Sequence, residues 1–237
     1  MENASYTMLT RQSGLLREMQ AIANNIANTA TTGFRQESVG FSEYVQRVEG
    51  EQSLSMALAN YDFSSTLQGA MTKTNGRFDF AIEGDGYFLV QSPEGERLTR
   101  AGSFAPNGQG DLVTKDGYPV LDPGGAPIFV PPDASDLSVS ADGTLSSNGR
   151  PLAQLGIVQP VEGAELLREG GVMFRVEGEF EPAASSRVVQ GFLENSNVDA
   201  VSQIARMIAV QRAYEMGQSF AEAEHERTRT ALKTLLK

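Results

Sequence analysis

The sequence contains no cysteine and no tryptophan, and its single histidine is His225. The absence of cysteine excludes disulfide bonds and thiolate chemistry, and it leaves the redox compartment undetermined. A histidine-based metal cluster or a Ser-His-Asp triad also lacks its parts, because His225 stands alone in a charged segment. We interpret His225 as a solvated helix residue.

Carboxylates are the remaining catalytic option, with Glu83, Asp85 and the nearby Asp79 as candidates. Asp85 lies between two glycines, so a turn already explains it. The pair Gly84 and Gly86 lacks the third glycine and the following helix of a dinucleotide-binding fingerprint, so we expect no cofactor. We therefore expect a protein that is not an enzyme and that holds no metal.

Long apolar runs are missing as well. The longest runs have four residues, as at positions 87–90 and 207–210, whereas a membrane-spanning helix needs about 18 or more. We therefore expect no direct membrane insertion. The first twenty residues carry Glu2 and Arg11 and have no apolar core segment, so we expect no secretory signal peptide and an export route of another kind.

Both ends of the chain lack proline. All ten prolines lie between residues 93 and 182, and 19 of the 24 glycines lie between residues 69 and 191. The ends carry apolar residues mainly at helical spacings: Leu9, Leu16, Met19, Ala23 and Ile26 near the start, and Val201, Ile204, Ile208, Ala209, Ala213, Met216, Phe220 and Ala223 near the end. This pattern predicts helices of about 40 and 55 Å, too long to be buried in one compact globule. Each apolar stripe must therefore face a partner.

Charge is divided unevenly along the chain. Residues 1–35 and 197–237 each carry a net charge of +1, whereas residues 36–196 contain ten basic and 23 acidic residues, a net charge of −13. Nearly neutral ends can associate with little repulsion, but an acidic middle repels polyanions. Nucleic acid is therefore not an expected partner.

The middle of the chain has the pattern of β structure. Phe78, Phe80 and Ile82 alternate with other residues, a Gly-Asp-Gly turn follows at 84–86, and an apolar run resumes at 87–90. Further turn signals with short apolar runs between them continue towards residue 195, which favours an all-β domain. The polar content from about 52 to 75 favours an extended connector.

The sequence thus predicts an α+β fold. In it, the long N- and C-terminal helices pair as an α-helical coiled-coil-like domain beside a central all-β domain. The expected boundaries are an N-terminal helix in 1–35 that pairs with 196–237, an extended connector in 36–75, a β-rich domain in 76–195 and a C-terminal helix in 196–237.

Three asparagines, Asn24, Asn25 and Asn28, cluster near the end of the first predicted helix. Asparagine is a mediocre helix former because its amide competes for backbone hydrogen bonds. One interpretation is that the cluster ends the helix, with Gly33 beyond it. The alternative is that Asn24 and Asn28, four residues apart, present their amides to neighbouring helices in an assembly.

Several ordered blocks of the sequence resemble one known family. The blocks are Ala23-Asn-Asn-Ile-Ala-Asn-Thr29, Thr32-Gly-Phe34, Ala81-Ile-Glu-Gly-Asp-Gly-Tyr-Phe88, Thr99-Arg-Ala-Gly-Ser-Phe104, Leu112-Val113, Asp116-Gly-Tyr-Pro-Val-Leu121, Asp142-Gly-Thr144, Gln190-Gly-Phe-Leu-Glu-Asn-Ser-Asn-Val198 and Gln211-Arg-Ala-Tyr-Glu215. Together they resemble the rod and hook proteins of the bacterial flagellar basal body. Within that family, the short length and the opening Tyr6-Thr-Met-Leu look most like the proximal rod protein.

The resemblance implies a structural subunit that polymerises helically into a torque-transmitting shaft, with paired terminal helices inside and the β domain outside. It implies other rod subunits, proximal and distal, and further copies of the same chain as partners. It also implies export by the flagellar type III apparatus and a location in the basal-body rod that spans the periplasm. The charged C-terminal tail, with Glu222, Glu224, Glu226, Arg227 and Arg229, departs from the usual pattern of the family.

Pattern and resemblance together predict an assembly interface on the terminal helices. Its expected residues are Leu16, Met19, Ala23, Asn24, Asn25, Ile26, Asn28, Val201, Ile204, Ile208, Tyr214 and Phe220. Two alternatives remain open: a distal rod or hook-type axial subunit, and a secreted binding module in which an acidic β domain is mounted on a helical stalk.

Overall fold

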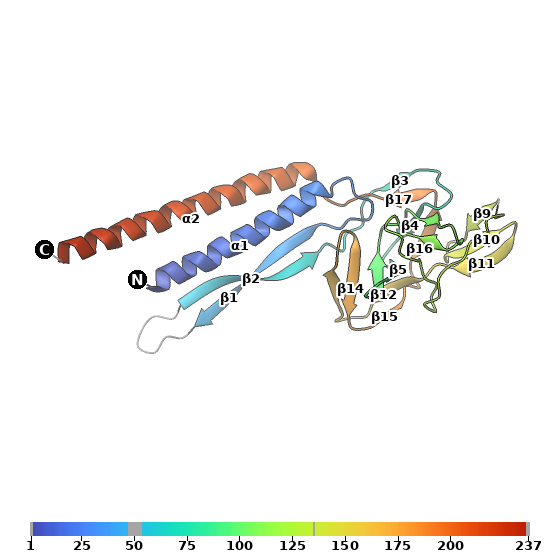
Figure 1. Ribbon diagram of the computed structural model, residues 1–237, viewed down its shortest axis with the longest axis horizontal. Helices are drawn as coiled ribbons and strands as arrows, with labels where there is room; N and C mark the ends of the chain where they lie inside the picture. Colours follow the sequence, from blue (N-terminus) through green and yellow to red (C-terminus); the bar gives the residue numbers. More distant parts are fainter. Residues whose placement is uncertain (1, 47–53, 135, 236–237) are drawn as a thin grey trace. The chain divides into compact units, whose positions relative to one another are not determined.

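The computed structural model describes residues 2–46, 54–134 and 136–235. The chain folds into two compact units (Figure 1). The first comprises Met1–Ala27, Gln36–Ser65 and Val198–Lys237, and the second comprises Asn28–Arg35 and Thr66–Asn197. The chain therefore passes from one unit to the other at four places, after residues 27, 35, 65 and 197.

The first unit consists of two long helices and a β-hairpin. Helix α1 spans Glu2–Ala27 and helix α2 spans Ala200–Leu235. Strand β1 (Glu37–Gln46) pairs in antiparallel fashion with strand β2 (Leu54–Ser64). Helix α1 contacts α2 and both strands, so it lies between α2 and the hairpin (Figure 1).

The prediction of a coiled-coil-like domain made by the paired terminal helices is wrong. The β1-β2 hairpin also packs against α1. On α2, the positions that are turned away from solvent are Val210, the polar Gln203 and the half-buried Gly217. A coiled coil requires large apolar side chains at the positions that face the partner helix. The apolar stripe of α2 instead points largely into solvent, because the helix turns a different face towards α1.

The regular secondary structure described in the second unit consists of short strands joined by turns and loops. Their bounds are β3 Met71–Lys73, β4 Phe80–Glu83, β5 Tyr87–Ser92, β6 Gly95–Thr99, β7 Ala105–Pro106, β8 Leu112–Val113, β9 Leu137–Val139, β10 Thr144–Ser147, β11 Arg150–Gln154, β12 Ile157–Pro160, β13 Glu165–Arg168, β14 Met173–Glu177, β15 Phe180–Pro182, β16 Arg187–Gln190 and β17 Phe192–Glu194. Six of them form one sheet in the order β13-β14-β6-β5-β12-β15. The others form a three-stranded sheet, β11-β10-β9, and the pairs β16-β4, β17-β3 and β7-β8.

Strand β5 lies near the centre of the six-stranded sheet and is buried on both faces. Phe88 and Val90 belong to one apolar cluster, whereas Tyr87 and Leu89 belong to a second cluster. Successive side chains of a strand point to opposite faces. The unbroken apolar run at 87–90 is therefore the signature of a strand with a core on each side.

The strands on either side of the turn at 84–86 each pair with other strands: β4 pairs with β16, and β5 pairs with β6 and β12. One local expectation differs from the structure. In the range 36–75, where we expected an extended connector, the structure has the β1-β2 hairpin followed by β3. Polar residues can occupy a strand that is covered on one face only, so composition alone did not reveal this hairpin.

Candidate assembly interface

Helix α2 presents large apolar side chains to solvent along about 30 Å of its length. Val201 is 76% exposed, Met216 67% and Phe220 59%, and Ile204 and Ile208 are each about half exposed. Surface residues of this size are normally covered when they recur on one helix. Four of the predicted interface residues, Val201, Ile204, Ile208 and Phe220, belong to this stripe, whereas Tyr214 is half-buried.

Helix α1 contributes fewer exposed apolar residues. Leu9 is 60% and Leu16 44% exposed, and Ala23 is also exposed. Met19 and Ile26, which we had placed in the same interface, are half-buried within the subunit. The predicted stripe of α1 is therefore divided, because part of it faces α2 or the hairpin and part of it stays open to solvent.

The asparagines act inside the subunit rather than only at its surface. Asn25 is 1% exposed, and its amide pairs with the backbone of Glu37 at the start of β1, donating to the oxygen at 2.8 Å and accepting from the nitrogen at 2.8 Å. The Asn25 amide also donates to the Gln203 side chain of α2 at 3.2 Å. Asn24 donates to the Glu37 carboxylate at 2.7 Å, and Asn28 accepts from the Thr31 hydroxyl at 3.0 Å.

Sequence reasoning missed the polar contacts that join the two helices. The Arg206 guanidinium lies 2.6 Å from the Glu18 carboxylate, which is largely covered. Like the bond between Asn25 and Gln203, this ion pair joins residues nearly 180 or more positions apart. Local periodicity carries no signal for such pairs, so only the placement of the helices reveals them.

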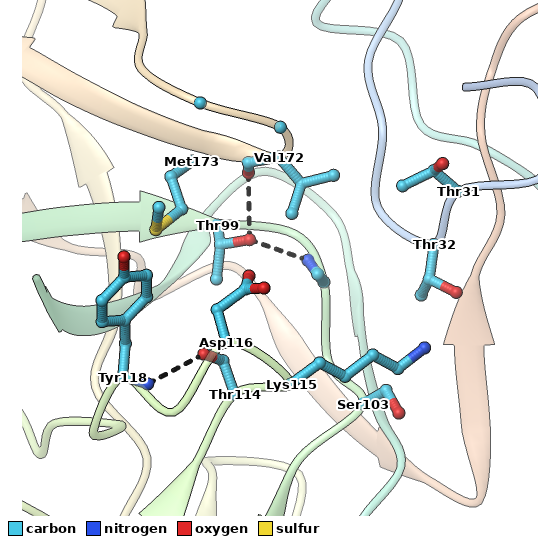
Figure 2. A pocket seen from close by; sticks show the side chains of 13 residues that line it. Thr31, Thr32, Thr99, Ser103, Thr114, Lys115, Asp116, Tyr118, Val172 and Met173 are labelled. Carbon is cyan, nitrogen blue, oxygen red and sulfur yellow. Dashed lines mark hydrogen bonds between the residues drawn. The ribbon is translucent and has the colours of Figure 1, made fainter. Parts of the chain in front are cut away.

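The second unit contains a pocket of about 490 Å³ beside the segment that precedes Gly33. Figure 2 shows that hydroxyl groups surround it; the lining residues are Thr31, Thr32, Thr99, Ala101, Ser103, Thr114, Lys115, Asp116, Tyr118, Gly170, Gly171, Val172 and Met173. The Thr99 hydroxyl is held between the oxygen of Val172 and the nitrogen of Ala101. The pocket offers one cation, one carboxylate and no histidine, a set without an evident nucleophile and base pair.

The candidate catalytic carboxylates do not assemble a site. Asp79 accepts a hydrogen bond from the Thr74 hydroxyl at 2.6 Å, and Glu83 and Asp85 are exposed. Across 2–46, 54–134 and 136–235, no group of three or more acidic or histidine side chains is arranged to hold a metal ion. In the same ranges, no helix combines the length and apolar character that crossing a membrane requires.

Comparison with known proteins gives two family matches and several full-length relatives. Residues 81–147 match the flagellar hook protein FlgE/F/G D1 domain, and residues 189–234 match the C-terminal domain of the flagellar basal body rod FlgEFG proteins. The chain is 36% identical to the flagellar basal-body rod protein FlgF of Caulobacter vibrioides and 35% identical to that of Mesorhizobium japonicum, in each case over 99% of this chain and 98% of the relative.

A relative of a second type matches nearly as well. The flagellar basal-body rod protein FlgG of Caulobacter vibrioides is 35% identical over 87% of this chain and 90% of its own length. These matches confirm the resemblance seen in the sequence blocks, including the likeness to FlgF. The chain belongs to the flagellar basal-body rod protein family.

Proposed function

We propose that this chain, a structural subunit of the flagellar basal-body rod, polymerises helically through its two terminal helices. Together with other axial subunits it forms the shaft that transmits torque. The observation that carries the proposal is the exposed apolar stripe of α2, from Val201 to Phe220. The exposed positions Leu9 and Leu16 on α1 add to it.

The stripe supplies enough energy for a subunit contact. Burying apolar surface yields about 25 cal/mol per Å², so a few hundred Å² of stripe yields several kcal/mol per contact. The stripe of one copy must meet a different surface of the next, and a contact of that kind that does not close into a ring continues as a helical filament. Many helices packed in this way give a stiff tube.

The finer parts of the proposal rest on the family. We propose a proximal position in the rod, because the full-length relatives include proteins named FlgF. The partners are then neighbouring rod subunits and further copies of this chain, the export route is the flagellar type III apparatus, and the rod spans the periplasm. The subunit works by assembly and catalyses no reaction.

A single added charge tests the interface. Ile208→Asp places a carboxylate in the exposed stripe, at a side chain that is 48% exposed in the isolated subunit. Purified variant protein should keep its fold by circular dichroism, while basal bodies isolated from the variant strain should lack complete rods in electron micrographs. Desolvating an unpaired carboxylate in an interface costs several kcal/mol, which offsets the several kcal/mol that one contact yields.

Gln218→Asp is the matched control, since it adds the same charge at another exposed position of α2. It should leave rods intact. Complete rods in the Ile208→Asp strain would contradict the interface.

Deletion of the gene distinguishes the alternatives: basal bodies that stop at the inner-membrane rings support the proximal position, and a longer remaining stub supports a distal rod or hook-type subunit. Normal flagella would favour a secreted binding module.

A further inference from the structure

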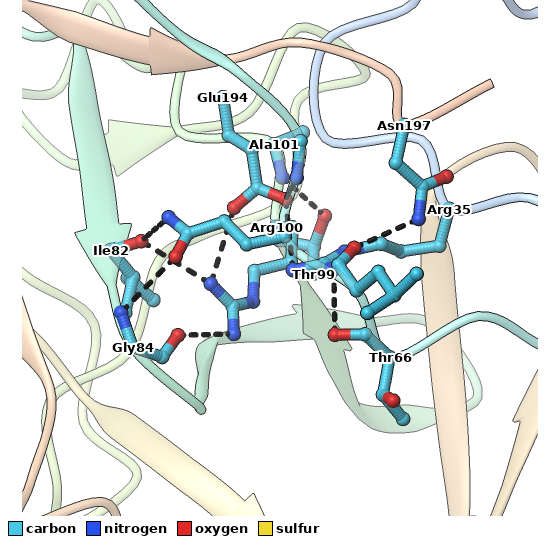
Figure 3. A network of polar contacts seen from close by, with 12 residues as sticks. Arg35, Thr66, Ile82, Gly84, Thr99, Arg100, Ala101, Glu194 and Asn197 are labelled. Atoms are coloured by element: carbon cyan, nitrogen blue, oxygen red, sulfur yellow. Dashed lines mark hydrogen bonds and ion pairs between the residues drawn. The ribbon is translucent and has the colours of Figure 1, made fainter. Parts of the chain in front are cut away.

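The four places where the chain passes between its units share one buried cluster of charges within the second unit. Its centre is Glu194, the last residue of β17, which is 0% exposed. One carboxylate oxygen lies 2.8 Å from the Arg35 guanidinium and accepts from the nitrogen of Gly69 at 3.2 Å. The other lies 3.1 Å from the Arg100 guanidinium. Figure 3 shows the side chains of Glu194, Arg35 and Arg100 converging.

Every segment that enters or leaves the second unit touches this cluster. Arg35, the last residue before the second passage, donates to the oxygen of Thr66 at 2.8 Å and to the oxygen of Leu67, the first two residues after the third passage. Asn197, the last residue before the fourth passage, donates from its side chain to Leu67 at 2.8 Å and from its backbone to Phe34 at 3.3 Å.

The segment that follows the first passage is fixed in the same place. The nitrogen of Gly33 donates to the backbone oxygen of Glu194 at 2.7 Å. Phe34 is 0% exposed, and the Arg168 guanidinium stacks over its ring at 4.4 Å and over the ring of Phe174 at 4.7 Å. The short segment 28–35 is thus an integral part of the second unit.

The electrostatics of the cluster make Glu194 the residue on which it depends. Two buried guanidinium groups share this one carboxylate. Arg100 is otherwise held by the backbone oxygens of Gly84 at 2.7 Å and Ile82 at 3.3 Å. Burial lowers the pKa of Arg100, and the negative charge of Glu194 opposes that shift. Removing one partner of a buried ion pair is strongly destabilising, because the other charge is left without compensation.

We propose that Glu194 is the positioning residue that ties together all four connections of the second unit. In the assembled rod this cluster keeps the connections in fixed positions when torque is applied to the subunit. This second step rests on the proposed function. The inference is specific to one carboxylate. It binds Arg35 of the segment 28–35 and Gly69 of the segment that begins at Thr66, and Glu194 itself belongs to the segment that ends at Asn197.

Hydrogen exchange on the purified full-length subunit tests the proposal. In Glu194→Gln, protection should fall by about tenfold or more at the amides of Gly33, Gly69 and Asn197, because each lies on a segment that the cluster holds. Amides at the centre of the six-stranded sheet, such as Leu89, should change much less. Unchanged protection at the three amides would overturn the proposal.

A second variant distinguishes local release of the segments from general unfolding. Arg35→Lys keeps the charge but replaces the planar guanidinium fork, so it cannot serve Glu194, Thr66 and Leu67 at once. It should release the segment after residue 65 and leave the sheet protected. Equal loss of protection at all amides in both variants would show that these are ordinary core residues, and would overturn the proposal.

The matched control is Glu169→Gln, which removes the same charge from a carboxylate bound to Arg97 at 2.6 Å and Arg175 at 2.7 Å. In cells, Glu194→Gln should allow a normal number of rods but reduce rotation in viscous medium, whereas Glu169→Gln should not. Normal rotation, or loss of the rods, would overturn the mechanical role. Loss of the proposed function itself would appear separately, as normal flagella after gene deletion, and would leave the exchange result standing.

Discussion

At the scale of single residues, the most informative side chain is Asn25. Its amide forms two hydrogen bonds with the backbone of Glu37, one as donor and one as acceptor, as a residue of a paired strand does. The same amide reaches Gln203 of α2, so one buried side chain joins α1, β1 and α2. This accounts for an asparagine in a helix, where its intrinsic preference is poor.

Replacing Asn25 should therefore destabilise the first unit. In Asn25→Ala the backbone of Glu37 loses two hydrogen bonds and the side chain of Gln203 loses one, and each lost bond costs about 0.5–1.5 kcal/mol. Urea unfolding followed by helical circular dichroism should show this loss. Gln20→Ala, at an exposed position of the same helix, is the control and should change stability little. Equal midpoints for the two variants would contradict the role of Asn25.

Tyr87 makes the stability of the second unit depend on pH in the alkaline range. Burial raises the pKa of its phenol above the usual 10.0, although the nearby charges of Arg100 and Arg35 partly oppose the shift. The unfolded tyrosine therefore ionises first. The stability that this group contributes is complete below pH 10.0 and is lost as the pH rises through the folded pKa.

Absorbance titration of the tyrosines should include a late phase that comes from Tyr87. In Tyr87→Phe that late phase should vanish, and unfolding midpoints should fall less as the pH rises above 10.0. A late phase that survives in Tyr87→Phe would assign the shift to another tyrosine.

At the scale of elements, the sequence predicted what depends on local periodicity. Both helices lie within the ranges 1–35 and 196–237 where helices were expected, and the run at 87–90 is in a strand. The hairpin β1-β2 and the insertion of 28–35 into the second unit were not predicted. Both depend on contacts between distant segments, as when Phe34 meets Arg168, and propensity does not record such contacts.

The segment 28–35 provides an element-scale prediction through Gly33. Its φ is +71°, and a Cβ there would lie 2.3 Å from the nitrogen of Ala101 and 2.4 Å from the carbonyl carbon of Arg100. In Gly33→Ala the backbone must shift, so the segment 28–35 should lose its contacts with the rest of the second unit. The free energy of unfolding of the second unit should then fall by well over about 1 kcal/mol.

Gly117→Ala separates this clash from backbone strain. Gly117 also has a positive φ, +84°, but a Cβ there would meet nothing within 4 Å. That variant should lose only about 1 kcal/mol from strain. Differential scanning calorimetry of both variants measures the difference, and similar transition temperatures would show that the close approach at Gly33 is easily relaxed.

At the scale of the whole molecule, charge is divided unevenly along the chain. Residues 36–196 carry a net charge of −13, whereas each end, which carries one of the long helices, has a net charge of only +1. Composition alone revealed this division. It could not reveal that the two helices turn other faces towards each other, and so it could not show which side of α2 stays open to a neighbour.

This segregation predicts how self-assembly of the purified chain responds to salt. The stripes attract each other through apolar contact, which added salt does not weaken, while the acidic middles of adjacent copies repel each other. Raising the salt from about 0.01 to 0.15 M shortens the Debye length from about 30 to 8 Å and screens that repulsion. The critical concentration for filament growth should therefore fall, as measured by light scattering and sedimentation.

The Ile208→Asp variant should stay monomeric at every salt concentration, because screening cannot restore a stripe that carries a desolvated charge. A critical concentration that rises with salt would instead mean that charge attraction, rather than the apolar stripe, holds the subunits together. A size that stops at a small closed oligomer would mean that the contact closes on itself, as in a helical stalk, and does not propagate into a rod.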